Sequence, residues 1–190
     1  AGGGDHALRL SVTRGPGARG LRIPADARPS VLATIAPWRP SMAFTSVTLA
    51  RVGIRRNETS PLSRMKTLAY LDNVLALEEA AAGGADDALV LNTAGRVAAT
   101  SMANLFVLRG SDLMTPPVAD GVLPGTLRAL FLTRAGEAGL VAREASLGPD
   151  DLFTADAVLA TNSLRLVMEV AAIDGRALPR RAEAAVAALR

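Results

Sequence analysis

The stretch from Ser60 to Phe106 constrains the fold more than any other part of this 190-residue chain. It contains a single lysine, Lys66, in an otherwise uncharged run, then an apolar pattern of helical spacing, and then two strand-like runs. The adjacent glycines Gly83 and Gly84 supply the end of the predicted helix. This succession of helix and paired strands indicates a fold of the α/β or α+β class.

A helix is predicted over residues 67–82. Its apolar face is expected to form core scaffold behind Lys66. Tyr70 follows the lysine by four residues and could point toward the same site, but a tyrosine that packs its ring on a helix face is the commoner case, so Tyr70 is left outside the site. The apolar residues at helical spacing are Leu68, Leu71, Val74, Leu75 and Ala82.

Lys66 is the candidate nucleophile of the chain. A lysine held among apolar groups loses hydration in its charged form, which lowers its pKa and frees the amine to form a Schiff base with a carbonyl compound. The alternative is a solvated lysine at the start of a helix, which is the commoner role of lysines. The residues around Lys66 leave both interpretations open.

Strand-like alternation before this stretch divides the chain into two parts. Residues 7–13 and 30–36 are predicted to form strands, and the Pro-Trp-Arg-Pro run at residues 37–40 follows them. The next predicted strand covers residues 45–54, and the polar loop after it carries charges that are expected to be solvated. We therefore predict a small N-terminal domain over residues 1–40 and a large C-terminal domain over residues 41–190.

Three further segments have chemistry that suits anion binding. Residues 14–20 (RGPGARG) could hold an anion with their arginines and glycines, or form an ordinary hairpin turn. Pro124 and Gly125 precede a predicted helix, whose free N–H groups and dipole attract phosphate. Residues 161–163 (TNS) end a predicted strand with hydroxyl and amide groups, or simply turn the chain.

The composition argues against several classes of protein. With no cysteine, the chain has no disulfide, thiolate catalyst or Cys-type zinc site, which is compatible with a reducing cytoplasm. One histidine, His6, excludes a metal centre built on histidines. The formal charge of +3 comes from dispersed arginines, and aromatics make up only 3%, so neither a nucleic-acid stripe nor a stacking platform is expected. No apolar run approaches the length of a membrane span.

Several motifs follow one another in a characteristic order over about residues 8–175. They read S-P-L-x-x-x-K-T-L, Y-L-D-N-V-L-A-x-E-E-A, G-A-D-D-A-L-V-L-N-T-x-G, N-L-F, T-P-P, G-V-L-P-G-x-x-R and A-T-N-S. This order resembles the class IV aminotransferase superfamily, the pyridoxal-phosphate (PLP) enzymes of fold type IV, and is most similar to its 4-amino-4-deoxychorismate lyase branch. The resemblance implies a D-amino-acid aminotransferase-like fold, with the end of a small N-terminal α/β domain and a large domain of mixed, barrel-like sheet with flanking helices.

The resemblance also implies roles for individual residues. Lys66 would hold PLP as a Schiff base and act as the catalytic residue. The helix N-terminus at Gly125 would hold the PLP phosphate through backbone N–H groups, and Arg19 would contact the substrate carboxylate. The implied cofactor-binding residues are Lys66, Leu123, Gly125, Thr126, Leu127, Asn162 and Ser163, and the implied substrate-binding residues are Arg19 and Asn162.

The sequence departs from the family pattern in two places. The N-terminal segment with the arginine that holds the cofactor phosphate has no match, so we expect a fragment, a processed chain or an unobserved start. Ala99 stands where most members have a glutamate that pairs with the pyridine nitrogen of PLP. Three explanations stay open: a branch whose chemistry tolerates an unprotonated ring, a different residue that supplies the proton, or a cofactor binder with little activity.

The expected function follows from the lyase resemblance. The reaction would convert aminodeoxychorismate to 4-aminobenzoate and pyruvate in folate biosynthesis. The alternatives are an aminotransferase of branched-chain or D-amino acids and a non-catalytic PLP-binding homologue. The expected partners are a small-molecule amine or amino-acid-like substrate and a second copy of the chain in a cytoplasmic homodimer, with no nucleic acid, membrane or metal.

Overall fold

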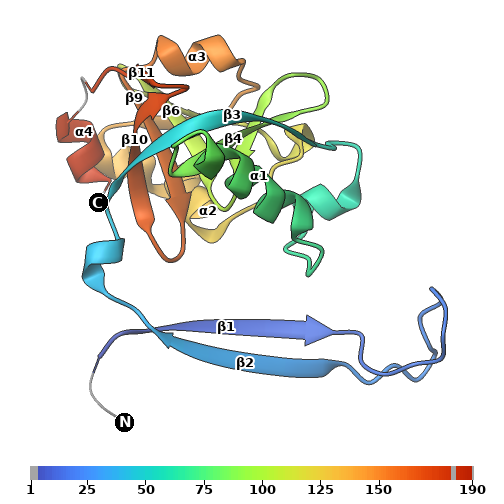
Figure 1. The fold of residues 1–190 in the computed structure, drawn as a ribbon. Helices are drawn as coiled ribbons and strands as arrows, with labels where there is room; N and C mark the ends of the chain where they lie inside the picture. The colour runs from blue at the N-terminus through green and yellow to red at the C-terminus, as the bar shows by residue number, and fades with distance from the viewer. Residues whose placement is uncertain (1–3, 181–182, 190) are drawn as a thin grey trace. The chain divides into compact units, whose positions relative to one another are not determined.

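The computed structural model describes residues 4–180 and 183–189 (Figure 1). The chain divides into two compact units, Ala1–Met42 and Ala43–Arg190. The smaller unit contains an antiparallel hairpin of β1 (His6–Thr13) and β2 (Ser30–Pro37), which pair along their whole length. The leucines and valine of β1 alternate with polar residues, but none of the residues of β1 or β2 is buried in the described chain.

The larger unit contains a nine-stranded mixed sheet and, within the described residues, four α-helices. The strands are β3 (Ser46–Arg56), β4 (Asp87–Asn92), β5 (Val97–Thr100), β6 (Asn104–Arg109), β7 (Asp112–Thr115), β8 (Val141–Glu144), β9 (Ala157–Asn162), β10 (Leu166–Ile173) and β11 (Arg176–Ala177). The helices are α1 (Leu71–Ala82), α2 (Thr126–Arg134), α3 (Pro149–Phe153) and α4 (Glu183–Ala188).

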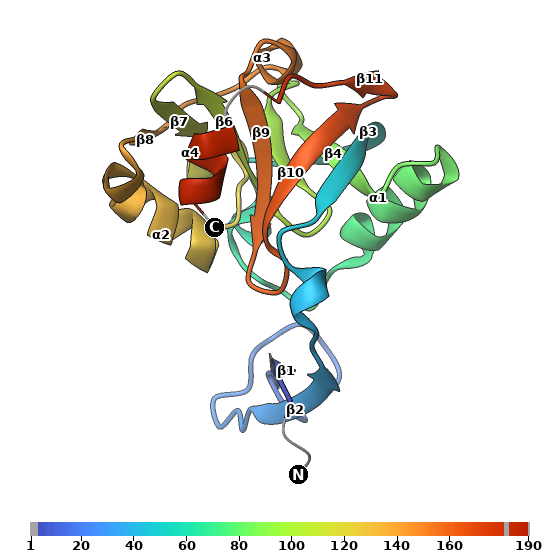
Figure 2. The ribbon, with the colours of Figure 1, turned by 90° about the vertical axis from the view of Figure 1, so that its left-hand side faces the viewer.

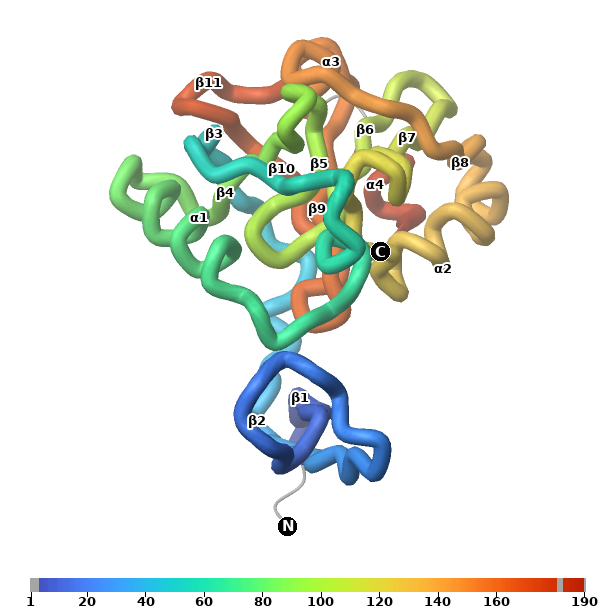
Figure 3. Tube along the Cα trace, turned by 90° about the vertical axis from the view of Figure 1, so that its right-hand side faces the viewer, coloured from blue at the N-terminus to red at the C-terminus, as the bar shows by residue number. Residues whose placement is uncertain are grey.

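The sheet of the larger unit curls around a core. Its strand order is β5-β4-β3-β10-β9-β6-β7-β8, and β11 pairs with β10. β3 runs parallel to β4 and β10, and β7 runs parallel to β8, while the other pairs are antiparallel. Helix α1 packs beside β3 and β4, and α2 packs beside β8 and β9 (Figures 2 and 3). The expected class, a mixed and barrel-like sheet with flanking helices, is confirmed.

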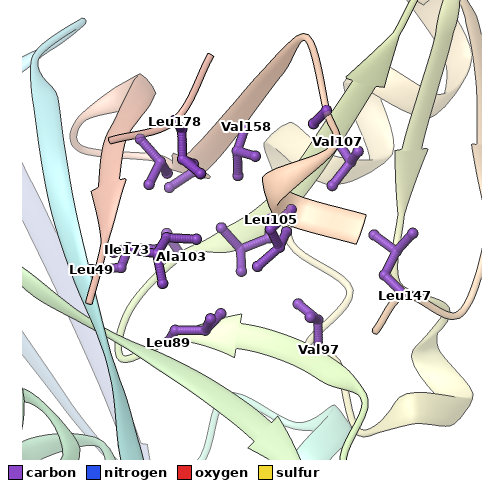
Figure 4. Packing of buried hydrophobic residues seen from close by; sticks show 14 of the residues in the cluster. Leu49, Leu89, Val97, Ala103, Leu105, Val107, Leu147, Val158, Ile173 and Leu178 are labelled. Carbon is purple, nitrogen blue, oxygen red and sulfur yellow. The ribbon is translucent and has the colours of Figure 1, made fainter. Parts of the chain in front are cut away.

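The main core lies on the concave face of the curled sheet. Figure 4 shows apolar side chains from different strands pointing toward one another, among them Leu89 of β4, Leu105 of β6 and Ile173 of β10, each with 0% exposure. A second cluster lies between the sheet and α2, where the rings of Phe106 and Phe131 are 5.4 Å apart between centroids. Because β6 contributes to both clusters, its sequence is almost continuously apolar instead of alternating.

Helix α1 differs from its prediction in two respects. It begins at Leu71, so residues 67–70 are not helical. Its leucine face is not core: Leu71 is 66% exposed, and Val74 and Leu75 are each 49% exposed. The buried residues of α1 are Asn73, Ala76 and Ala80. The physical reason is close approach, because the small alanine side chains let the helix backbone pack directly against β3 and β4.

Helix α3 is fixed over the main core by a carboxylate. Asp151 Oδ2 accepts the backbone N–H of Gly148 at 2.8 Å, and Asp151 Oδ1 accepts from Arg109 Nη2 at 3.0 Å. These bonds lower the pKa of Asp151, with the Gly148 N–H as the larger cause and the Arg109 guanidinium next. Leu152, fully buried beneath this cap, anchors the helix.

The C-terminal segment was predicted as a helix over residues 181–190. The structure has α4 over Glu183–Ala188, and residues 181, 182 and 190 lie outside the described part of the chain. Among the described helices, none has the length and apolar character that crossing a membrane requires.

Candidate functional site

A cleft of about 370 Å³ opens in the larger unit. Five segments that are distant in the sequence line it. They are the end of β3, the chain between Lys66 and Asn73, the connection from β5 to β6, the turn before α2, and the end of β9. The cleft therefore lies where strands of the curled sheet end and α2 begins.

Seven of the eight predicted site residues line this cleft. The eighth, Arg19, lies in the smaller unit, where it lines a separate cavity formed by its own loop between Pro16 and Arg28. The seven residues in the cleft are Lys66, Leu123, Gly125, Thr126, Leu127, Asn162 and Ser163.

Lys66 is the only lysine in the chain. It follows the short 3-10 helix Pro61–Arg64, and its Nζ lies 5.3 Å from the centroid of the Tyr70 ring. A cation at this distance from an aromatic face is attracted by the ring. Tyr70 was left outside the predicted site, but it lines the cleft beside Lys66. The four-residue spacing between Lys66 and Tyr70 was the sequence signal that could have placed Tyr70 in the site.

The surroundings of Lys66 differ from the sequence-based expectation. The lysine was expected among apolar groups that remove it from water, but it is exposed in the described chain. Its neighbours Met65 and Leu68 are themselves 58% and 57% exposed, so they do not form an apolar enclosure.

The turn before α2 presents hydrogen-bond donors to the cleft. The N–H groups of Thr126 and Leu127 lie in the first turn of a nine-residue helix, where no preceding carbonyl of the helix can accept them. The N–H of Gly125 donates to the Leu123 carbonyl at 2.8 Å, so the free donors are those of the next two residues. Thr126 Oγ1 and Ser163 Oγ lie 3.0 Å apart and add two hydroxyls. This donor set suits a phosphate group.

Asn104 holds this turn in place. Its Nδ2 donates to the Leu123 carbonyl at 2.8 Å, and a Cβ added to Gly125 would lie 2.2 Å from its Oδ1. The φ of Gly125 is −68°, which any residue can adopt. Glycine is therefore required here for space: only a residue without a side chain lets the turn pack against Asn104.

Asn162 has a turn-forming role in addition to its place in the cleft. Its Oδ1 accepts the backbone N–H groups of Leu164 and Arg165 at 3.0 and 2.8 Å. The side-chain carbonyl is thus used by the β9–β10 turn, and this turn sets Ser163 against Thr126. The Thr-Asn-Ser segment therefore forms a turn, and the same three residues line the cleft.

The cleft contains buried polar atoms that have no protein partner. Of the five buried side-chain nitrogen and oxygen atoms without a hydrogen bond among the described residues, three belong to residues of this cleft: Arg56 Nε, Ser101 Oγ and Thr161 Oγ1. Ser101 and Thr161 are each only 2% exposed. A buried polar atom left unpaired costs about 1–3 kcal/mol, and the residues around this cleft carry an unusual share of the unpaired polar atoms of the described chain.

Arg56 was expected to be a solvated loop residue. The structure instead makes it the last residue of β3, half-buried and facing the cleft. β3 extends two residues beyond the apolar alternation that predicted it, and no sequence signal indicated this extension.

No group of three or more His, Cys, Asp or Glu side chains that could hold a metal is found in the part of the chain that the structure describes.

The cleft fits the cofactor that the motifs imply. A phosphate would find the free backbone N–H groups of Thr126 and Leu127 and two hydroxyls, and an aldehyde would find the only lysine of the chain. The lining contains no aspartate or glutamate among the described residues, and Ala99 lies in it with 7% exposure. The ring nitrogen of such a cofactor would therefore meet no carboxylate from these residues.

Comparison with known proteins identifies the family of this chain. The family model of amino-transferase class IV matches residues 1–173. A Methanocaldococcus jannaschii protein provisionally named a branched-chain-amino-acid aminotransferase is 33% identical over 175 residues, which are 92% of this chain and 61% of that protein. This chain thus spans about three fifths of that relative.

Solved structures share the fold. A Legionella pneumophila protein, provisionally named a 4-amino-4-deoxychorismate lyase, has a TM-score of 0.83 and 32% identity over 90% of this chain and 63% of that one. An aminotransferase from Brucella abortus, solved with the cofactor PLP, has a TM-score of 0.86 and 26% identity over 99% of this chain and 68% of that one. The family match over residues 1–173 shows that this chain belongs to the class IV aminotransferases.

Proposed function

We propose that this chain forms the cofactor-binding part of a PLP-dependent enzyme, and that the enzyme is a 4-amino-4-deoxychorismate lyase. The observation that carries the first statement is the convergence of the only lysine with the free N–H groups of Thr126 and Leu127 in one cleft. The Brucella abortus structure, which holds PLP, supports the choice of cofactor.

The residues of the cleft have separate tasks in this proposal. When bound, PLP supplies an aldehyde that condenses with amines and a conjugated ring that accepts electrons from the reacting carbon. Thr126, Leu127 and Ser163 would hold the phosphate, and Leu123 would pack on the ring. Lys66 would anchor the cofactor and, as a free amine, would serve as the base at the amine-bearing carbon of the substrate.

The lyase reaction balances without any further reactant. Lys66 removes the proton from the amine-bearing carbon of aminodeoxychorismate. The electron pair enters the substrate ring, the C–O bond to the enolpyruvyl group breaks, and the ring becomes aromatic 4-aminobenzoate. The released enolate takes a proton, which Lys66 can return, and becomes pyruvate. Aromatisation supplies a driving force that compensates for a weak electron sink, which suits a cleft with Ala99 in place of a carboxylate.

An aminotransferase of branched-chain or D-amino acids is the second candidate. The name of the Methanocaldococcus jannaschii relative favours it. In that reaction Lys66 would move the substrate proton to the cofactor and the amino acid would leave as a keto acid. Ala99 weighs against it, because transamination depends more strongly on a protonated ring. A PLP binder with little activity is the third candidate and rests on Ala99 alone.

The experiment compares the full-length protein with Lys66→Ala and Lys66→Arg. PLP is added, the mixture is reduced with borohydride, and the modified peptide is found by mass spectrometry. The expected result is a PLP-modified peptide that contains Lys66 in the wild type and no modification at this position in either variant. Lys66→Arg is the matched control, since it keeps the positive charge but cannot condense with an aldehyde.

Substrate tests then separate the three candidates. Pyruvate release from aminodeoxychorismate supports the lyase. Keto-acid formation from amino acids without pyruvate release supports the aminotransferase. Attachment of PLP without either product supports the binding protein, and a lack of lysine-dependent attachment overturns the proposal.

The remaining proposals concern the whole protein. Residues 1–40 are proposed to be the end of a small N-terminal domain, and Arg19 to bind the substrate carboxylate, so that Arg19→Gln raises KM more than it lowers kcat. A cytoplasmic homodimer is proposed on the family resemblance, and sedimentation equilibrium would test its mass.

A further inference from the structure

The charged groups that line the cleft are all basic. Among the described residues of the lining, the basic side chains are Arg56 and Lys66, and no aspartate or glutamate is present. With Lys66 bonded to the cofactor, as proposed, Arg56 is the cation that remains beside the ring. A carboxylate beside a pyridine nitrogen favours the protonated, cationic form, whereas neighbouring cations favour the neutral form. The cleft therefore favours the neutral form of the ring nitrogen.

The backbone of Arg56 is fixed by the sheet, whereas the Nε of its guanidinium has no hydrogen-bond partner. Its backbone carbonyl accepts the N–H of Thr93 at 3.1 Å, and it pairs with Asn92 of β4 in the sheet register. Its Cγ lies so close to Gly121 that a Cβ added there would be 2.8 Å away. Beyond this fixed stem, Nε is buried and has no hydrogen-bond partner. The side chain lines the cleft, and its buried Nε is a donor without a protein acceptor.

Arg56 and Ala99 belong to the same part of the sheet. β4 lies between their strands: Arg56 pairs with Asn92, and Ala99 pairs with Val90. Both residues line the cleft. A ligand ring placed over Ala99 would therefore have Arg56 as the cationic donor from the neighbouring part of the sheet.

A guanidinium can only donate, because it stays protonated throughout the accessible pH range. Its complement is an acceptor, and an unprotonated pyridine nitrogen is one. We propose that this cleft keeps the ring nitrogen of bound PLP unprotonated, with Arg56 as its hydrogen-bond donor. The inference rests on the proposed function in so far as PLP is the ligand.

This inference favours the first of the three explanations for Ala99, a chemistry that tolerates an unprotonated ring. No aspartate or glutamate among the described residues of the cleft replaces the missing carboxylate, which weighs against a substitute residue. An unprotonated ring withdraws electrons less strongly, which disfavours reactions that need a long-lived carbanion. Arg56 is therefore a cofactor-positioning residue. It favours reactions that have a driving force of their own, such as the formation of an aromatic product.

The test uses the holoprotein loaded with PLP that carries nitrogen-15 in its ring. The nitrogen-15 chemical shift distinguishes protonated from unprotonated pyridine without any turnover. The wild type is expected to give the unprotonated signal, and Ala99→Glu to move it to the protonated range. Arg56→Gln is expected to shift the signal and weaken PLP binding by roughly tenfold. Arg55→Gln is the matched control, because Arg55 lies next in sequence but outside the cleft lining.

Each part of the inference can fail separately. A protonated nitrogen in the wild type overturns the inference while PLP binding and the proposed function stand. An identical signal and affinity in Arg56→Gln and Arg55→Gln overturn the assignment of Arg56. A protein that binds no PLP overturns the proposed function and this inference together.

Discussion

Replacing Gly125 with alanine tests whether the turn before α2 is fixed by space. The added Cβ would lie 2.2 Å from Asn104 Oδ1, well inside the 3.0 Å that real Cβ atoms respect. The nearest atom belongs to a side chain that is itself bound to the Leu123 carbonyl at 2.8 Å and only 7% exposed. Asn104 therefore cannot rotate away without breaking that bond inside the protein.

The expected magnitude combines three contributions. Overpacking of a tight site costs about 1–3 kcal/mol, and loss of one hydrogen bond costs about 1 kcal/mol. Because the φ of Gly125 is accessible to alanine, the reduced entropy of the unfolded chain returns about 0.4–1 kcal/mol. We expect Gly125→Ala to lower the free energy of unfolding by about 1–3 kcal/mol and to weaken PLP binding, since the turn carries the proposed phosphate donors.

Urea denaturation at pH 7 measures this effect, with Gly136→Ala as the matched control. Gly136 has no heavy atom within 4 Å of an added Cβ and is exposed, so the control is expected to be neutral or to gain up to about 1 kcal/mol. The double variant Gly125→Ala with Asn104→Ala removes the clash, so its cost should be at least about 1 kcal/mol smaller than the sum of the single costs. Equal stability of the two glycine variants, or strict additivity in the double variant, would refute the steric argument.

Three further changes test the fold. The pKa of Asp151 is lowered in the folded state, so its ionised form stabilises the protein above the ordinary value of 3.8, and that contribution is lost as the pH falls through the folded-state pKa. Asp151→Asn should therefore lower the free energy of unfolding by up to about 1 kcal/mol at pH 7, after allowance for solvent screening. Urea titrations should show that this difference from the wild type shrinks below pH 4, and that the control Asp150→Asn has the stability of the wild type. Phe106→Ala should lower the free energy of unfolding by about 3–5 kcal/mol, because the fully buried ring leaves a cavity against α2; a loss below 1 kcal/mol in calorimetry would contradict this packing. On α1, Leu71→Gln should change the free energy of unfolding by less than about 0.5 kcal/mol, whereas Ala76→Leu should lower it by about 1–3 kcal/mol. A larger loss for Leu71→Gln than for Ala76→Leu would show that the leucine face of α1 is the buried one.

Local patterns in the sequence were sufficient for much of the site. The free donors at the start of α2 follow from a glycine that precedes a helix, and the Thr-Asn-Ser turn follows from residue types that turn chains. Lys66 and the two segments proposed to bind phosphate were therefore singled out without coordinates, and the structure places them in one cleft. The placement of Arg56 and Tyr70 in this cleft was missed, because it depends on neighbours that are distant in the sequence or on a helix that begins later than its apolar pattern suggests.

The sequence alone determined the class of fold, the order of the strands and helices along the chain, and the identity of the single lysine. Only the tertiary structure decided which face of α1 is buried and which side chains share the cleft. The physical reason is that periodicity records how a segment alternates, but burial depends on what packs against it. The alanines of α1 approach β3 and β4 more closely than its leucines could, and the register of β3, β4 and β5 sets Arg56 and Ala99 in one lining.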